Sequence, residues 1–414
     1  MNARGPDFDL EVARFLVSPE GVAAGVELAG REPERALLED LRRRFDAPRA
    51  SALLDRERGR RSLEGKDPDA RTLHAGYLAA QQSSGAVAAA HRARRFAEAG
   101  VSRLTEIGCG VGLDTRALAR RLRVLAVDLD PGRLVLARAN LAALGPEIAD
   151  AALFARVDAA STALRPDVFY ADPDRRADGR RSPDPERASP PLSFLLEDLA
   201  GRAPARGFAI KLSPLTPLES LRGRGELEFV SVGRELRELV LWGGELARVE
   251  RRVSIPGEGG EFVGEPGGRA PDGPLGAFLL DPDPALGRSG LLERFVLACG
   301  ARLLVPGGSY ATADEPVGTP LFRAEAIRGV FPAKPAAVRK ELRARGLGRV
   351  RISRRDFAVD PVAYERQLRL DGRGGIARLH LTRTVEGPRV LLTEPAPGDN
   401  ANPPEPPGSS EVSR

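Results

Sequence analysis

The stretch V-S-R-L-T-E-I-G-C-G-V-G-L-D, residues 101–114, is followed by a helical stretch and then by R-V-L-A-V-D-L-D, residues 123–130. Gly108, Gly110 and Gly112 have no Cβ, so the backbone can turn sharply there and a ligand can approach the peptide groups. The pattern predicts a strand, a glycine-rich turn, a helix and a second strand that ends in an acid. Such a unit builds a nucleotide-type cofactor pocket in an α/β fold.

Two carboxylates near this turn indicate the kind of cofactor. Glu106 precedes the first glycine by two residues, where it would repel a pyrophosphate but would suit an ammonium, as in the methionine part of S-adenosylmethionine. The dinucleotide fingerprint G-x-G-x-x-G would also need glycine at position 113, which is Leu113. Asp128 ends the second strand, where a carboxylate can accept both ribose hydroxyls. An ordinary βα turn and a nicotinamide or flavin enzyme remain the alternatives at this point.

The third and fourth predicted strands also end in acidic residues. A third short strand ends at Asp158, which is placed to accept from an adenine amino group. A fourth strand runs into D-P-D-R-R, residues 172–176, at the edge where parallel sheets put their reacting groups. We expect Asp172 to orient an acceptor nitrogen. Arg175 and Arg176 can stack on a base or clamp a phosphate, and the alternative is that they pair with nearby acids.

These motifs resemble the class I methyltransferase superfamily. The D-P-x-R-R motif, together with Lys211-Leu-Ser-Pro214, 280–285 (L-D-P-D-P-A) and 310–316 (Y-A-T-A-D-E-P), looks like a bacterial family of methyltransferases with a THUMP-like carboxyl-terminal domain and a small ferredoxin-like segment. The resemblance implies S-adenosylmethionine as cofactor and RNA as substrate. The predicted cofactor contacts are Glu106, Gly108, Gly110, Gly112, Asp128, Leu129, Asp158 and Ala159, and the predicted catalytic residues are Asp172, Arg175 and Arg176.

A basic segment supports RNA as a partner. Residues 339–355 contain eight basic residues in 17, and only Glu341 opposes them. The 63 basic residues among 414 would give about 2.6 in a stretch of this length. The alternative is a solvated face exaggerated by the arginine-rich composition. The predicted substrate contacts are Lys211, Arg339, Lys340, Arg343, Arg351, Arg354 and Arg355.

The order of the patterns predicts the domains. A helical cap at 1–85 precedes a Rossmann-like methyltransferase domain at 86–255 with seven strands in a mostly parallel sheet, the last strand near 238–242 or 249–254. Pro and Gly make up 11 of the 19 residues at 256–274, which predicts a linker. The remaining predicted parts are a ferredoxin-like α+β segment at 275–318, a THUMP-like basic domain at 319–393 and a disordered tail at 394–414.

Composition excludes several classes of protein. The chain has two cysteines, Cys109 and Cys299, and no apolar signal core or membrane-length apolar run, so we expect a cytoplasmic protein without disulfides or membrane contact. The three histidines are scattered, so no metal site is expected. The net charge of +5 is basic without being extreme. The oligomeric state is left open.

The resulting hypothesis is a methyltransferase that modifies a base nitrogen of ribosomal or transfer RNA and grips the RNA through its THUMP-like unit. One alternative is an enzyme that methylates a small molecule or a protein. Another, from a different class, is a non-catalytic scaffold that binds S-adenosylmethionine and RNA.

Overall fold

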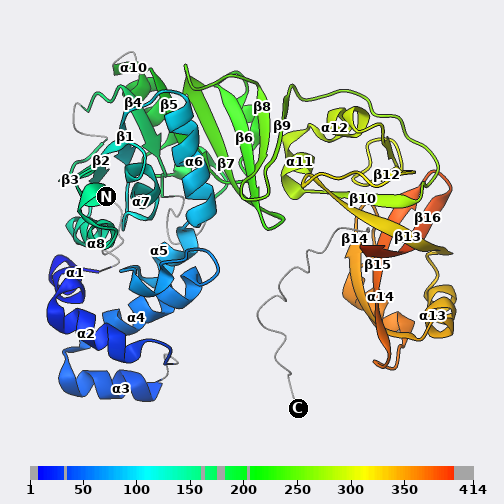
Figure 1. Ribbon diagram of the computed structural model, residues 1–414, viewed down its shortest axis with the longest axis horizontal. Helices are drawn as coiled ribbons and strands as arrows, with labels where there is room; N and C mark the ends of the chain where they lie inside the picture. The colour runs from blue at the N-terminus through cyan, green and yellow to red at the C-terminus, as the bar shows by residue number, and fades with distance from the viewer. Residues whose placement is uncertain (1–7, 32–34, 160–163, 175–181, 203–205, 396–414) are drawn as a thin grey trace. The chain divides into compact units, whose positions relative to one another are not determined.

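The computed structural model describes residues 8–31, 35–159, 164–174, 182–202 and 206–395 (Figure 1). The chain forms two compact units. The first comprises residues up to Val232 together with Leu236–Glu250, and the second comprises Gly233–Glu235 together with the residues from Arg251 onward. Within the described ranges, no helix is both long enough and apolar enough to cross a membrane.

The first unit begins with a set of helices that corresponds to the predicted cap. Asp9 and Asp46 cap two of these helices by accepting from the backbone N–H groups of Val12 and Arg49. Their core includes the buried Leu16 and extends to Leu136 of the following domain, so cap and domain share apolar packing. The helices are α1 (Leu10–Val17), α2 (Pro19–Leu28), α3 (Arg35–Arg44), α4 (Ala47–Leu63), η1 (Ala70–Thr72) and α5 (Tyr77–Gln82).

The sheet of the first unit has the strand order β3-β2-β1-β4-β5-β7-β6. The first five strands of the chain pair in parallel, and β7 pairs antiparallel with β5. The order changes direction between β1 and β4, which is where open α/β sheets bind ligands. The strands are β1 (Arg103–Ile107), β2 (Arg123–Asp128), β3 (Ala152–Arg156), β4 (Val168–Ala171), β5 (Gly207–Leu212), β6 (Glu226–Val232) and β7 (Glu235–Gly244).

Helices cover this sheet, as Figure 1 shows. On one of them, α6, Phe96 packs against Trp242 of β7 with ring centroids 5.0 Å apart. The predicted Rossmann-like arrangement of a mostly parallel sheet with covering helices is present. Both predicted candidates for the last strand are strands: the one near 238–242 lies in β7 of the first unit, and the one near 249–254 overlaps a strand of the second unit at Arg251–Ile255. The connecting elements are α6 (Ala86–Glu98), α7 (Leu113–Ala119), α8 (Pro131–Ala142), α9 (Pro146–Ala149), η3 (Pro185–Arg187), η4 (Phe194–Leu199), α10 (Ala200–Arg202) and η5 (Leu218–Leu221).

The second unit contains a β-hairpin and a seven-stranded sheet in the order β11-β12-β10-β13-β16-β15-β14. Helices α13 and α14 bury Val338, Leu342, Tyr364 and Leu368 in the core of this sheet. Its elements are β8 (Arg251–Ile255), β9 (Gly260–Gly264), β10 (Phe278–Pro282), α11 (Pro284–Ser289), α12 (Leu292–Ala298), β11 (Arg302–Leu303), β12 (Ala311–Ala313), β13 (Phe322–Pro332), α13 (Pro335–Ala344), β14 (Leu347–Arg354), α14 (Pro361–Leu368), β15 (Gly375–Thr384) and β16 (Gly387–Pro395).

Three domain boundaries differ from the sequence-based expectation. The segment 256–274 was expected to be a linker, but it contains β9, and Gly257 and Gly259 adopt positive φ in the turn that leads into that strand. The segments 275–318 and 319–393 share one sheet, because β10 pairs with β13. The first two residues of the predicted tail belong to β16, and residues 396–414 lie outside the described residues.

Candidate active site

The glycine-rich turn connects β1 to α7 and has the backbone conformation that its glycines permit. Gly108, Gly110 and Gly112 have φ values of 73°, 55° and 78°, in the left-handed region that other residues rarely adopt. A Cβ on Gly112 would lie 3.1 Å from the Cα of Ala137, so this glycine allows the turn to pack against α8. A Cβ on Gly110 would meet no atom within 4 Å. Gly110 therefore borders open space, as expected for a ligand cradle.

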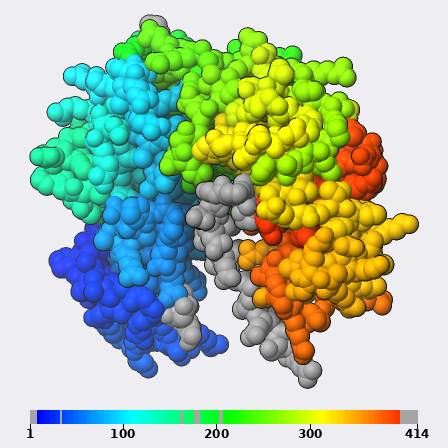
Figure 2. Space-filling model, turned by 45° about the vertical axis from the view of Figure 1, so that its right-hand side comes forward, coloured from blue at the N-terminus to red at the C-terminus, as the bar shows by residue number. Residues whose placement is uncertain are grey.

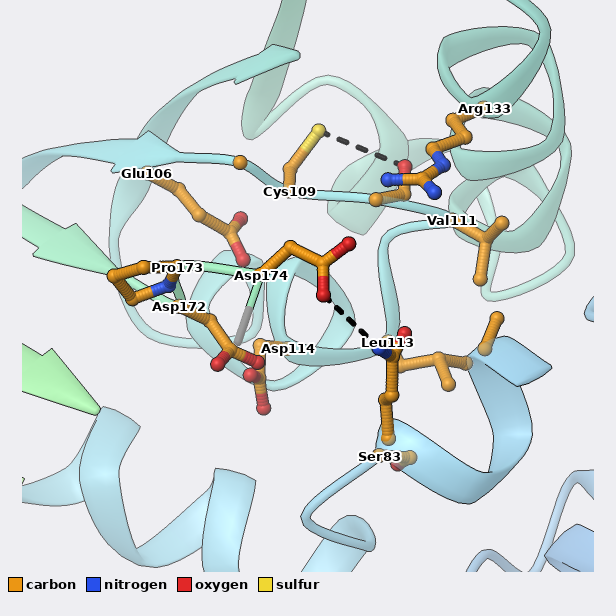
Figure 3. Close-up of a pocket in the computed structure, with 14 residues that line it drawn as sticks. Ser83, Glu106, Cys109, Val111, Leu113, Asp114, Arg133, Asp172, Pro173 and Asp174 are labelled. Atoms are coloured by element: carbon orange, nitrogen blue, oxygen red, sulfur yellow. Dashed lines mark hydrogen bonds between the residues drawn. The ribbon is translucent and has the colours of Figure 1, made fainter. Parts of the chain in front are cut away.

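A pocket with an empty volume of about 840 Å³ lies against this turn. It brings together four of the predicted residues: Glu106, Gly108, Gly110 and Asp172. Figure 3 labels Glu106 and Asp172 among the side chains that line it. Its other walls come from α5, from the first residues of α7, from α8 through Arg133, and from the segment after β4. The pocket is thus assembled at the carboxyl ends of β1 and β4, at the switch point of the sheet.

Glu106 is the most deeply buried acid of the pocket, with 2% of its surface exposed. Thr115 Oγ1 donates a hydrogen bond of 2.6 Å to its Oε2. Burial raises the pKa of Glu106 to about 8, and the neighbouring negative charge of Asp114 adds to the effect. A positive ligand group would relieve this unfavourable environment, so the side chain fits an ammonium.

Asp172 follows β4 and faces the pocket with 28% of its side chain exposed. Lys211 Nζ of β5 lies 2.6 Å from Asp172 Oδ2 and also donates to the backbone oxygen of Gln82 at 3.4 Å. The Lys211 side chain is only 3% exposed. Lys211, a predicted substrate contact, holds its ammonium group against Asp172.

Asp114 lines the pocket and was missed from the sequence. Arg92 Nη1 donates to its Oδ1 at 2.9 Å and the Tyr170 hydroxyl donates to its Oδ2 at 2.8 Å. Burial alone would raise the pKa of Asp114, but Arg92 and Lys211 outweigh burial and lower it. The buried Arg92 also donates to both carboxylate oxygens of Glu238 on β7. The position of Asp114 in the first turn of α7, directly after the glycine turn, was the available signal.

The α5 helix closes one side of the pocket through Ala79, Gln82 and Ser83. Gln82 Nε2 donates to Asp174 Oδ1 at 3.4 Å, the hydrogen bond drawn beside Asp174 in Figure 3. The backbone of Asp174 is fixed by a bridge to Ser189. The structure thus places both Gln82 and Ser83 at the pocket.

Asp128 fixes the glycine turn. Its Oδ2 accepts from the N–H of Gly110 at 2.8 Å and its Oδ1 accepts from the N–H of Asp130 at 2.9 Å. Leu129 beside it is 55% exposed. Asp158 and Ala159 follow β3, which pairs with β2, so these four predicted residues lie at the carboxyl ends of adjacent strands. These four residues lie along the same edge of the sheet as the pocket, but they are not among the residues that line it.

The other predicted residues are spread over the chain. Arg175 and Arg176 lie outside the described residues. Arg339, Lys340 and Arg343 are on α13, and Arg351 and Arg354 are on β14. For Arg355, also a predicted substrate contact, Nη2 lies 2.8 Å from Asp281 Oδ1 and donates to the Pro282 oxygen, so part of the guanidinium contacts β10.

The cofactor that the motifs imply fits this pocket. Glu106 can hold an ammonium, the open side of Gly110 leaves room for a ligand, and Arg133 contributes a guanidinium that suits a carboxylate. Throughout the described ranges, no cluster of three or more His, Cys, Asp or Glu side chains could bind a metal ion.

Three comparisons with known proteins identify the family of this chain. Residues 323–395 match the THUMP domain-like family model. An uncharacterized S-adenosylmethionine-dependent methyltransferase of Mycobacterium tuberculosis, found in two strains, is 36% identical over 306 residues, which cover 71% of this chain and 80% of the relative. A crystal structure from Porphyromonas gingivalis W83, described as that of a methyltransferase, aligns with a TM-score of 0.69 at 20% identity and covers 94% of this chain and 100% of that chain.

The structural match confirms the predicted class I methyltransferase fold. The mycobacterial relatives show that the similarity also holds at the level of the amino-acid sequence. With them, S-adenosylmethionine is shown to be the cofactor of this enzyme. The chain belongs to the family of S-adenosylmethionine-dependent methyltransferases with a THUMP-like carboxyl-terminal domain.

Proposed function

We propose that this enzyme methylates an amino nitrogen of a base in ribosomal or transfer RNA, in the cytoplasm. The observation that carries the proposal is the Asp172 carboxylate, which borders the cofactor pocket and is held by the buried Lys211 at 2.6 Å. A fixed carboxylate beside the transferable group is suited to an acceptor that presents N–H donors.

The chain's own residues account for what such a reaction requires. S-adenosylmethionine, when bound, supplies an electrophilic methyl group. Asp172 would accept a hydrogen bond from the acceptor amine, orient its lone pair and take up the proton that the nitrogen loses. Asp174, which follows Pro173, lines the same pocket and offers a second acceptor for the amine.

The cysteine in the pocket argues against transfer to a pyrimidine carbon through a thiolate. Burial and the charge of Glu106 raise the pKa of the Cys109 thiol well above its ordinary value. A thiol that stays protonated is a poor nucleophile. The carboxylates Asp172 and Asp174 are therefore the better candidates for contact with the acceptor, which favours a nitrogen.

RNA as the acceptor is supported by the THUMP-like match at 323–395 and by basic residues in the same region. Arg351 on β14 is one of these basic residues, and its charge suits a phosphate. The free thiols of Cys109 and Cys299 agree with a reducing compartment.

The test is transfer of labelled methyl from S-adenosylmethionine to RNA, DNA, protein and small-molecule fractions of a host that lacks the gene. We expect label in RNA that ribonuclease removes and that Asp172→Asn abolishes. Label in the protein or small-molecule fraction, with none in RNA, would overturn the proposed substrate and identify the other acceptor class.

A further inference from the structure

A groove with an empty volume of about 820 Å³ lies beside β14 in the second unit. Arg349 and Arg351 of β14 form one wall, and Arg366 and Arg369 at the end of α14 form another. Only one acidic residue, Glu365, lines the groove. Figure 2 shows the surface of this part of the chain in orange.

The cations of the groove are available to a ligand. Within the described part of the chain, the side chains of Arg351, Arg366 and Arg369 form no hydrogen bond or ion pair, whereas Arg349 donates to the Gly374 oxygen at 3.0 Å. Asp371, whose side chain is close to Gly348, adds a second negative charge beside the groove. Four arginines against two acids leave a net charge of +2, so the groove favours an anion.

The backbone at Arg369 is unusual for an arginine. It ends α14 with φ 47° and ψ 51°, the left-handed conformation that glycine adopts most easily at such a position. A side chain there costs conformational energy, and this one lines the groove. The guanidinium of Arg369 thus joins those of Arg349, Arg351 and Arg366 in the lining of the groove.

The groove follows an open edge of the sheet. β14 is the terminal strand in the strand order, and it pairs in parallel with β15. Arg349 and Arg351 are two residues apart and so lie on the same face of the strand. The lining includes the exposed Ile376 and no aromatic side chain. Without an aromatic platform for stacked bases, the groove is suited to the sugar-phosphate backbone and not to particular bases.

We propose that this groove, lined by Arg349, Arg351, Arg366 and Arg369, binds the phosphates of the RNA backbone without reading its sequence. The proposal rests on the proposed RNA acceptor for its biological role. It assigns the grip on RNA to the β14 edge and not to Arg339 and Lys340 on α13. Those two residues provide a matched control, because they lie in the same domain and carry the same charge.

The experiment measures binding of the full chain to a fluorescent single-stranded oligouridylate of about 20 nucleotides by anisotropy, between about 50 and 200 mM salt. We expect Arg351→Gln with Arg366→Gln to weaken binding roughly tenfold. The slope of log affinity against log salt should fall by about 1.4, since each phosphate contact contributes about 0.7 for a single strand. Arg339→Gln with Lys340→Gln should leave both quantities nearly unchanged, and circular dichroism checks that both double variants are folded.

An equal loss of affinity in the two double variants, or no loss in the groove variant, would overturn the proposal. Failure of the proposed function is a separate result. If oligouridylate binds through the groove but no RNA fraction accepts methyl label, the groove proposal is supported and the proposal that RNA is the methyl acceptor is wrong. If RNA is methylated while the groove variant binds and reacts like the wild type, RNA is supported as the methyl acceptor and the groove proposal is wrong.

Discussion

Lys211 Nζ lies 2.6 Å from Asp172 Oδ2, and this ion pair joins the ends of β4 and β5 at the border of the cofactor pocket. The ammonium group is buried, while the carboxylate keeps one side toward the pocket. The pair fixes where the carboxylate points before any acceptor arrives. Fixed geometry of this kind is what a transfer between two bound groups needs.

Asp172→Asn should remove the proton acceptor and leave the cofactor site intact. We expect the turnover number to fall by about 10²- to 10⁴-fold, the usual contribution of a positioned acid or base, with unchanged affinity for S-adenosylmethionine. Calorimetric titration with the cofactor and a single-turnover methyl-transfer assay measure the two effects. Asp167→Asn is the control, since Asp167 is exposed on the same segment and does not line the pocket. Equal activities of the two variants would remove Asp172 from the mechanism.

Lys211→Met should act through the position of Asp172. Without its cation the carboxylate can turn away, and a displacement of about 1 Å can cost about 10²-fold in rate. The turnover number should therefore fall while the KM for S-adenosylmethionine changes little. If Lys211 instead contacted RNA, as its sequence context first indicated, the KM for RNA would rise and the turnover number would persist. A thermal melt of the variant separates either effect from loss of folding.

Glu106 makes stability and cofactor binding depend on pH. Its pKa rises from 4.5 to about 8 on folding, chiefly through burial. The ligand-free protein should therefore be most stable, as far as this group is concerned, below about pH 4.5, and should lose that contribution as pH rises through 8. Glu106→Gln should flatten the dependence of Tm on pH between 5 and 8.

The same carboxyl group should release a proton when an ammonium binds beside it, because the positive charge favours the ionised form. Titration calorimetry with S-adenosylmethionine at pH 7, in buffers of different ionisation enthalpy, measures that proton. Glu106→Gln should abolish the release. Binding with the same proton count in the wild type and in the variant would show that Glu106 does not face the ammonium.

The cofactor half of the site could be predicted because its signals are local. Gly108, Gly110 and Glu106 lie within five residues, and the spacing alone dictates a turn with an acid beside it. Asp172 could be predicted because every parallel strand of such a sheet ends at the same edge. These arguments need only the order of strands along the chain.

The remaining parts depend on contacts between distant residues. Lys211 reads as a free cation in the sequence, and only the pairing of β4 with β5 shows that it is buried against Asp172. Arg92 and Asp114 belong to different helices and meet through packing. In the second unit, Arg366 and Arg369 lie outside the basic segment at 339–355, yet they share a groove with Arg351. The density of basic residues along the sequence therefore points to this domain, but it does not show that Arg366 and Arg369 lie near Arg351.

Gly110→Ala and Gly112→Ala should separate cofactor binding from folding. Both residues have positive φ, so each substitution carries backbone strain of about 1 kcal/mol or more. The new Cβ at 112 would also press on Ala137 at 3.0 Å, whereas at 110 it would enter open space beside the pocket. We expect Gly112→Ala to lower Tm more than Gly110→Ala does, and Gly110→Ala to lose more affinity for S-adenosylmethionine per degree of Tm lost. Thermal melts and calorimetric titrations of both variants give that comparison. Parallel losses of stability and affinity in the two variants would mean that Gly110 supports the turn without bordering the ligand.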